Sequence, residues 1–383
     1  MKSIPGKMKR VMLTTAAFGL VAGMAQAGGV DRSGQSIGII FEKGNYAELS
    51  FGMINPSVSG TDVASFPTQS VAGNHSLPGI AFKYDLSDRL SFSLIYGQDY
   101  GADVYYPTAA AGGSPVLGGT SAVLDSDVVT GVLRYKFNEN FSVHGGIRAS
   151  KASGEVMLSG LAYDPPGPAN LSGYNVSFDE AWGTGYLIGG AYEKPEIALR
   201  VALTYFSKVG HDLDTVERIG ATQVAPASVT TVDTPQAVNL DFQTGVAPNT
   251  LAFGSVRWVD WSNFLIDPAW LTPTTGGGLV SLEDTTTYTL GVGRKFNENW
   301  SGSIFASYEP KGDPLVSPLA PTNGYRGIGI GVVYTQDNMK VTLGARYLDL
   351  GDAQPETGTP DTARANMTGN HAVAVGVKVG FNF

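Results

Sequence analysis

The chain has 383 residues, 50 of them glycine and none cysteine, and a formal charge of −9 at pH 7. The acidic balance excludes an electrostatic surface for nucleic acid, and the absence of cysteine excludes a disulfide framework and thiolate metal ligands. A mean hydropathy of zero without a long apolar run is unusual for a soluble α/β enzyme. It is expected of a wall in which apolar residues alternate with polar and small ones.

The first 27 residues have the pattern of an export signal. Residues 2–10 contain four cations and no carboxylate, residues 11–21 form a short apolar run, and Ala25-Gln26-Ala27 is a small-residue cleavage site. The run is shorter than the roughly 20 apolar residues that a spanning helix needs. Removal of the signal takes four of the 25 Lys and Arg, so 21 remain against 34 Asp and Glu and the charge becomes −13.

Residues 28–44 follow and carry an apolar patch, IGIIF at residues 37–41. We expect this segment to be hatch-like and to plug a lumen, or simply to enter the first strand. From residue 45 to residue 383 no linker separates independent patterns, which predicts one large closed sheet rather than two domains.

The chain after residue 45 repeats one unit: a strand, a tight polar turn, a second strand and a long Gly/Pro/Ser-rich connection. The turns contain Asn, Asp and Pro, which suit short hairpins. Two of them share the sequence KFNEN, at residues 136–140 and 295–299, which indicates an internal repeat. The six turns lie at residues 85–88, 138–140, 193–195, 247–249, 297–299 and 336–338.

The last strand shows the expected alternation most clearly. In HAVAVGVKVGFNF, residues 371–383, the odd positions from Val373 to Phe383 are apolar and the even positions are small or polar. This is the period of a strand with different surroundings on its two faces. The final aromatic residue behind an export signal is similar to the carboxyl-terminal signature of bacterial outer-membrane barrels.

Six turns with a strand on each side, plus one strand at each end, predict fourteen strands. We therefore predict an all-β fold, a transmembrane antiparallel β-barrel of about 14 strands with a short N-terminal plug-like segment. An even number of strands places both termini in the periplasm. The approximate spans are 45–58, 76–86, 89–101, 121–136, 141–151, 181–192, 196–209, 235–246, 250–261, 285–296, 299–310, 325–335, 339–349 and 371–383.

Two local features complete the predicted wall. Leu251 and Phe253 share one parity whereas Val256 and Trp258 take the other, which predicts a β-bulge near Gly254. Residues 152–180 and 210–234 are predicted to be the longest connections, and long loops on a barrel are usually functional lids or mouths.

Four stretches of the chain resemble the FadL/TodX family of outer-membrane transporters for hydrophobic compounds. They are residues 96–107, 199–213, 235–267 and 288–311, with the RWVDWS core at residues 257–262 as the most specific part. The resemblance implies a fourteen-stranded barrel with an amino-terminal hatch, capture of substrate at extracellular loops, an apolar pocket, and sideways release near a kinked third strand. It places capture at residues 152–180 and 210–234, and the lateral exit at Gly97 and Gly101.

Candidate cations for a substrate carboxylate come from the predicted lumen face. A fatty acid requires an apolar slot for its tail and a cation for its head group, and Arg is the best cation for a carboxylate. Arg148 and Arg200 lie nearest the two predicted long connections, so they are the preferred candidates. The alternative for any such cation is a salt bridge to a lumen acid such as Glu48 or Glu309, or hydration.

Candidate apolar contacts come from the same face. Phe206 and Phe305 have the lumen parity, where a water-filled pore favours polar groups, so they indicate an apolar pocket or else fill space under a loop. Leu158 and Leu161, in the first long connection, are the further predicted ligand-binding residues.

Catalysis is the least favoured class. Ser142 and His144 lie two apart on one strand face, as a nucleophile and base could, but no third member and no G-x-S-x-G motif accompany them. The four histidines show no metal-ligand spacing. We therefore expect no catalytic residues, no metal and no cofactor.

The sequence as a whole predicts passive transport of long-chain fatty acids or other hydrophobic small molecules by a monomeric barrel in the bacterial outer membrane. The expected partners are the hydrophobic substrate, outer-membrane lipid and lipopolysaccharide, and no nucleic acid. The alternative functions are a general diffusion porin for small hydrophilic solutes and, less favoured, an outer-membrane lipase.

Overall fold

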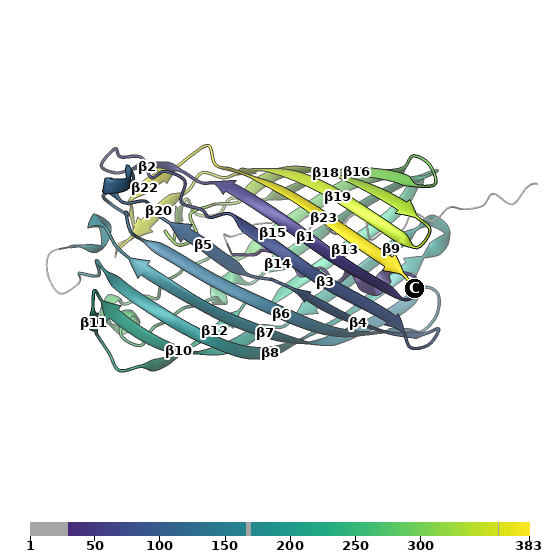
Figure 1. The fold of residues 1–383 in the computed structure, drawn as a ribbon, viewed down its shortest axis with the longest axis horizontal. Coiled ribbons are helices and arrows are strands. Elements are labelled where there is room, and N and C mark those ends of the chain that lie inside the picture. The colour runs from purple at the N-terminus through teal and green to yellow at the C-terminus, as the bar shows by residue number, and fades with distance from the viewer. Residues whose placement is uncertain (1–29, 166–169, 359) are drawn as a thin grey trace, which may run out of the picture.

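The computed structural model describes residues 30–165, 170–358 and 360–383, so the predicted export signal lies outside the described part. The described residues form a closed antiparallel β-barrel with fourteen strand positions (Figure 1), which confirms the predicted fold. The barrel closes where β1 (Tyr46–Ser57) pairs with β23 (His371–Asn382). No helix in the described residues is long and apolar enough to cross a membrane.

Most strand positions hold one continuous strand. Besides β1 and β23 these are β3 (His75–Asp85), β6 (Ser121–Lys136), β7 (Phe141–Leu158), β8 (Tyr174–Lys194), β14 (Thr250–Val259), β15 (Thr285–Lys295), β16 (Trp300–Glu309), β18 (Tyr325–Gln336) and β19 (Met339–Leu350). Three positions are each built from two segments in line. These are β4 (Leu90–Gly97) with β5 (Gly101–Tyr105), β9 (Leu199–Phe206) with β10 (Val209–Ile219), and β12 (Ser228–Thr234) with β13 (Ala237–Ala247).

Short elements decorate the end of the barrel opposite the carboxyl terminus (Figure 1). They include a two-stranded sheet of β2 (Gly60–Asp62) and β22 (Ala365–Met367). They also include a three-stranded sheet of β17 (Leu315–Val316), β20 (Gln354–Thr357) and β21 (Thr362–Ala363). We call this end the loop end. The connections at the loop end also contain short helical turns. They are η3 (Ala109–Ala111), η4 (Leu161–Tyr163), η6 (Trp261–Asn263) and α2 (Leu271–Thr275).

All six predicted tight turns connect paired strands, at the end where the carboxyl terminus lies (Figure 1). Asn249 and Asp337 adopt positive φ values of 58° and 51°. Asn and Asp tolerate this left-handed conformation, which two-residue hairpin turns require. The turn residues in the sequence therefore predict the positions of these hairpins correctly.

The two faces of the wall are inverted relative to a soluble protein. Ile147, Leu290 and Ile328 point outward with 70%, 62% and 63% of their surface exposed, whereas Lys83 and Arg346 are each 2% exposed inside. A soluble chain does not expose a continuous band of large apolar side chains while burying its charges. The arrangement is that of a barrel surrounded by lipid hydrocarbon.

The prediction that residues 152–180 and 210–234 are long connections is wrong. β7 continues to Leu158 and β8 begins at Tyr174, while β10 and β12 occupy most of the second range. Many outward residues of these strand extensions are polar, such as Glu155, Asp212 and Thr231, so the segments resemble loops in the sequence. The connection between β14 and β15, residues 260–284, is longer than the connection between β7 and β8 and the connection between β10 and β12.

The predicted bulge near Gly254 is also wrong. The register of β14 runs without a break from Val259 to Leu251 against both neighbouring strands, and the irregularity in this hairpin lies in β13, between Gly245 and Ala247. Leu251 and Phe253 are buried in the interior rather than facing lipid. The change of parity in the sequence reflects apolar residues inside the barrel, not an inserted residue.

Residues 30–44 lie inside the barrel and touch well-separated parts of its wall. Glu42 forms a 2.7 Å ion pair with Lys340 of β19, and the carbonyl of Gly34 accepts a 3.0 Å hydrogen bond from Asn239 of β13. The apolar side of the segment, including the short turn η2 (Gly38–Phe41), is buried with it. We call residues 30–44 the hatch segment.

Candidate functional site

The third strand position is interrupted. β4 ends at Gly97 and β5 begins at Gly101, and both segments pair with β6. β4 pairs with β3 only from Ile80 to Asp85, so residues 75–79 of β3 have β1 as a partner but no partner from β4 or β5. Pro78, which has no N–H to donate, lies in this unpaired edge. The wall therefore lacks its ladder of hydrogen bonds over these residues.

The hatch segment pairs with the interruption from inside. The N–H of Arg32 donates to the carbonyl of Asp99 at 2.8 Å, and the N–H of Gly101 donates to the carbonyl of Val30 at 2.9 Å. A Cβ at Gly101 would lie 2.1 Å from the guanidinium carbon of Arg32. Gly101 thus leaves room for the guanidinium of Arg32, which would have to move if this position carried a side chain.

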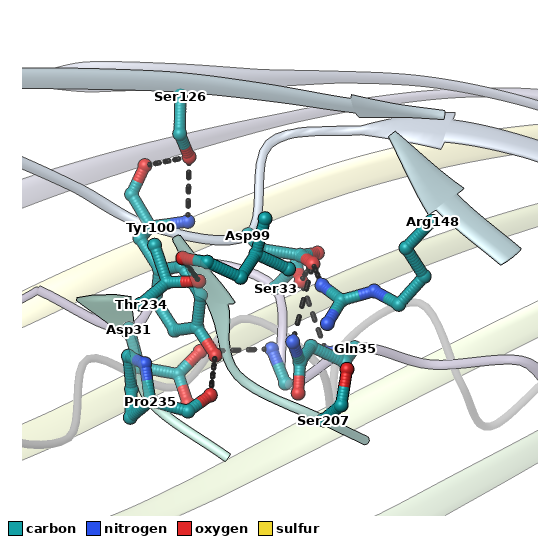
Figure 2. A network of polar contacts seen from close by, with 12 residues as sticks. Asp31, Ser33, Gln35, Asp99, Tyr100, Ser126, Arg148, Ser207, Thr234 and Pro235 are labelled. Carbon is teal, nitrogen blue, oxygen red and sulfur yellow. Dashed lines mark hydrogen bonds and ion pairs between the residues drawn. The ribbon is translucent and has the colours of Figure 1, made fainter. Parts of the chain in front are cut away.

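A buried polar network joins the hatch segment to the interruption (Figure 2). Asp99 forms an ion pair with Arg148 and accepts hydrogen bonds from the hydroxyl of Ser33 at 2.6 Å and the amide of Gln35 at 3.3 Å. The bend of the third strand is therefore fixed by one carboxylate that two hatch residues and one wall residue share.

A second buried ion pair anchors the hatch segment to β14. Arg257 contacts Asp31 at 2.8 Å and donates further hydrogen bonds to Gln35 at 3.2 Å and Asn239 at 2.8 Å. Burial raises the pKa of the Asp31 carboxyl, and the neighbouring Arg257 opposes that shift. Each of the two arginines in the network has a carboxylate partner.

A lumen cavity of about 280 Å³ lies beside the interruption. It is bounded by the hatch segment, by both lips of the gap in the wall, and by the inner faces of β7, β9 and β13. Lumen-facing and gap-facing residues share the lining, so the cavity reaches the unpaired part of the wall. Its lining includes Pro78, Gly79, Gly97, Gln98, Arg148 and Phe206.

A second, apolar cavity of about 60 Å³ lies toward the loop end. We call it the outer pocket. Its walls come from β5, β6, β7, β10, β12 and the connection 260–284, and no Lys or Arg is among its described lining residues. The lining includes Val30, Tyr100, Leu213, Val232, Trp261 and Phe264.

The two cavities meet the same short segments. Tyr100 and Val30 line the outer pocket, whereas Asp99 and Arg32, one and two residues away in the chain, line the lumen cavity. The hatch segment and the interruption of the third strand, tied by the network of Figure 2, therefore stand between the two cavities.

Some predicted ligand residues gather at the lumen cavity. Arg148, Arg200 and Phe206 line it, and the guanidinium of Arg148 lies 5.4 Å from the centre of the Phe206 ring. Arg148 is paired with Asp99, and Arg200 donates a 3.1 Å hydrogen bond to Gln243. Of the predicted exit residues, Gly97 lines the cavity, and Gly101 lies at the far end of the interruption.

The other predicted ligand residues lie elsewhere. Phe305 and Leu158 are buried but line neither cavity, and Leu161 is 64% exposed in the connection between β7 and β8. The salt-bridge alternative holds for several lumen cations. Arg134 pairs with Glu193 and Arg148 with Asp99, while Lys340 lies 2.7 Å from Glu42 and Lys378 lies 3.4 Å from Glu48.

Sequence reasoning missed the contribution of residues 260–284. Trp261 is fully buried, contacts Phe264 edge-on at a ring distance of 5.9 Å, and lines the outer pocket with it. The available signal was the apolar sequence WSNFLIDPAW at residues 261–270 after the end of a strand. An exposed connection has no reason to concentrate aromatic residues in this way.

Ser142 and His144 do not contact each other as a nucleophile and base. The hydroxyl of Ser142 accepts a 3.1 Å hydrogen bond from Arg134, and a ring nitrogen of His144 lies 2.9 Å from the hydroxyl of Thr204. Within residues 30–165, 170–358 and 360–383, no group of three His, Asp or Glu side chains is arranged to hold a metal ion.

These features define an outer-membrane-type β-barrel with an internal hatch and an interrupted wall. The family described as "Outer membrane protein transport protein (OMPP1/FadL/TodX)" matches residues 43–383. The chain belongs to this family, whose members are outer-membrane transport proteins. No curated protein matches the chain in sequence.

Solved structures share the fold at low sequence identity. A Pseudomonas aeruginosa FadL homologue is 13% identical with a TM-score of 0.72, covering 90% of this chain and 92% of that one. The Pseudomonas putida toluene transporter TodX is 12% identical with a TM-score of 0.62, covering 89% and 91%. The Ralstonia pickettii toluene transporter TbuX is 14% identical with a TM-score of 0.59, covering 90% of each chain.

Proposed function

We propose that this protein carries hydrophobic small molecules passively through the outer membrane. A molecule enters the outer pocket from the loop end, crosses the hatch segment into the lumen cavity, and leaves sideways through the interrupted wall. Fatty acids and neutral hydrocarbons both belong to this class of substrate. The proposal rests above all on the interruption between Gly97 and Gly101, because a cavity that reaches an unpaired stretch of wall gives an apolar molecule a route into lipid.

Physical chemistry supports this direction of travel. Transfer of an apolar molecule from water to the outer pocket is favourable by about 0.8 kcal/mol for each buried methylene. Transfer onward into bilayer hydrocarbon keeps that gain, so a hydrophobic molecule needs no energy source and no cofactor to complete the path. A hydrophilic solute gains no transfer free energy at either step, and the hatch segment lies across its path through the lumen.

The wall beside Gly97 offers a direct test. An added Cβ at this position meets no atom within 4 Å, so a side chain can begin there, and we expect the larger side chain of Gly97→Leu to narrow the exit. We expect lower uptake of radiolabelled toluene, octane and oleate into cells that lack other hydrophobic-compound transporters. Gly277→Leu is the matched control, since Gly277 also has open space but lies in the connection 260–284, away from the lumen cavity.

A conductance measurement separates transport of hydrophobic molecules from porin activity. Purified protein in planar bilayers is expected to conduct ions poorly, because residues of the hatch segment form ion pairs and hydrogen bonds with several strands of the wall. Steady ion conduction, together with uptake that Gly97→Leu leaves unchanged, would contradict the proposal and favour a diffusion porin.

A further inference from the structure

The carboxylate of Asp241 is open to the lumen cavity. Asp241 lies on β13 between Asn239 and Gln243, which share its strand face, point inward and are buried, whereas Asp241 is exposed. Asp241 also belongs to the lining of the lumen cavity. Because the side chain points inward and lines the cavity, its exposed surface faces the cavity rather than the membrane.

This carboxylate has no partner in the protein. Within the part of the chain that the structure describes, no hydrogen bond or ion pair reaches Asp241. Other charged groups of the same lining are paired, since Arg148 pairs with Asp99 and Lys378 lies 3.4 Å from Glu48. Charged groups inside proteins are normally paired. Asp241 is therefore an acceptor that the cavity presents to a molecule that enters it.

Arg200 keeps a positive charge near this carboxylate. Arg200 of β9 lies opposite Gln243 of β13, two residues along the strand from Asp241, so Arg200 and Asp241 are diagonal neighbours on one inner face. The guanidinium donates a 3.1 Å hydrogen bond to Gln243 and lies 4.2 Å from the centre of the Phe41 ring. An anionic ligand group would be repelled by Asp241, and a cationic one by Arg200. A neutral hydrogen-bond donor meets neither repulsion.

Aromatic rings supply an apolar surface in the same cavity. Phe206 and Phe253 are buried and belong to the lining, and Phe41 of the hatch segment belongs to it while half-buried. The cavity volume of about 280 Å³ exceeds the roughly 150 Å³ that suffices for benzene. A substituted benzene or a molecule of similar size therefore fits.

We propose that the lumen cavity binds a neutral molecule with a hydrocarbon body and one hydroxyl group, a phenol or a medium-chain alcohol, and that Asp241 accepts the hydrogen bond of that hydroxyl. This inference rests on the proposed transport function and narrows its substrate class. Asp241 is then a specificity-determining residue, while Phe206 and Phe253 contact the hydrocarbon body. A hydrogen bond to a charged acceptor is stronger than one between neutral groups, so the site favours the hydroxylated molecule over the parent hydrocarbon.

The test compares four ligands of similar size: ethylbenzene, p-ethylphenol, p-toluate and phenethylamine. Equilibrium binding of each radiolabelled ligand is measured at pH 7 on the full protein in lipid nanodiscs, with empty nanodiscs subtracted. We expect p-ethylphenol to bind about tenfold more tightly than ethylbenzene, which is the lower end of what a hydrogen bond to a charged group contributes. The anion and the cation are expected to bind more weakly than p-ethylphenol.

Two substitutions of Asp241 separate the role of the acceptor from that of the fold. Asp241→Leu removes the acceptor and should abolish the advantage of p-ethylphenol over ethylbenzene, whereas Asp241→Asn keeps a neutral acceptor oxygen and should retain a smaller advantage. Because the two ligands are compared within one variant, a general change in packing cancels. Asp349→Leu is the matched control, since Asp349 is also exposed on a strand, β19, but lies outside the cavity lining. Heat-dependent gel migration shows whether each variant retains a folded barrel.

The outcomes distinguish the inference from the function beneath it. Equal binding of p-ethylphenol and ethylbenzene, an advantage that survives Asp241→Leu, or tightest binding of p-toluate or phenethylamine would overturn the inference and leave transport of hydrophobic molecules standing. If none of the four ligands binds, the inference fails, and steady ion conduction by the same preparation would show that the proposed function fails with it.

Discussion

The ion pair between Asp31 and Arg257 holds the hatch segment to the wall, and its removal should loosen that segment. The side chains are 1% and 9% exposed. In Asp31→Asn the guanidinium keeps its charge, because Arg does not deprotonate in proteins, and its acceptors are then the neutral amide oxygens of Gln35, Asn239 and the new side chain. Breaking a buried pair by removing one partner costs about 3–5 kcal/mol. The amide oxygen that the substitution introduces restores part of this energy. We therefore expect the closed hatch segment to be destabilised by about 3 kcal/mol, so that it opens about a hundredfold more often.

Substitution of the other partner, Arg257, should loosen the hatch segment less. In Arg257→Gln the remaining carboxyl is buried, and burial raises its pKa, so it can take up a proton instead of staying charged. We therefore expect Asp31→Asn to loosen the hatch segment more than Arg257→Gln does. Asp233→Asn is the control, because its pair with Lys208 is exposed and contributes below about 1 kcal/mol.

Hydrogen exchange at pH 7 in nanodiscs measures the opening. The amides of Arg32 and Gly101 report directly, since they form the two backbone hydrogen bonds between hatch and wall. Exchange in Asp31→Asn at the wild-type rate, or a larger effect in Arg257→Gln, would refute the reasoning. Unchanged exchange in β18 and β19 would show that the barrel itself is intact.

Three further predictions address the wall, the hatch contact and the loop end. Ile147→Arg places a cation in the outward apolar band and should destabilise the barrel by about 2–4 kcal/mol in urea titration from lipid, whereas Val63→Arg, at a position 62% exposed in the connection between β1 and β3, should change stability little. Gly101→Ala should speed exchange of the Arg32 amide, because the new methyl group overlaps the guanidinium; an unchanged rate would contradict the contact. Burial and then the nearby Asp361 and Asp313 carboxylates raise the pKa of Glu356, so its neutral form is favoured in the folded state. Protection of the β20–β21 pair should therefore be greatest at acid pH and decline as pH rises through that raised pKa, and Glu356→Gln should flatten the profile in exchange measurements.

The sequence predicts the strands and turns of the wall well because both depend on residues that are close together in the chain. Alternation in residues 371–383 reports which side chains meet lipid, and Ala372 and Ala374 are indeed buried while Val373 and Val375 are exposed. Hairpin turns are set by a few residues with suitable backbone preferences, so the six turns and the count of fourteen follow directly.

The interior is less predictable because its contacts join residues far apart in the chain. The parity of Phe253 could be assigned correctly only with knowledge that the lumen has apolar contents. The partnership of Arg148 with Asp99 depends on how the third strand bends, and no spacing rule reveals it. The outer pocket escaped prediction for the same reason, since Trp261 reaches it from a connection that has no regular period.

Photolabelling along the proposed path tests the central claim most directly. Protein in nanodiscs is exposed to a diazirine derivative of toluene, irradiated, digested and mapped by mass spectrometry. The account predicts labels on Trp261 and Phe264 in the outer pocket and on Leu77 and Gln98 at the gap, with the gap labels reduced in Gly97→Leu. Labels confined to lipid-facing residues such as Ile147 and Leu290 would contradict a route through the barrel.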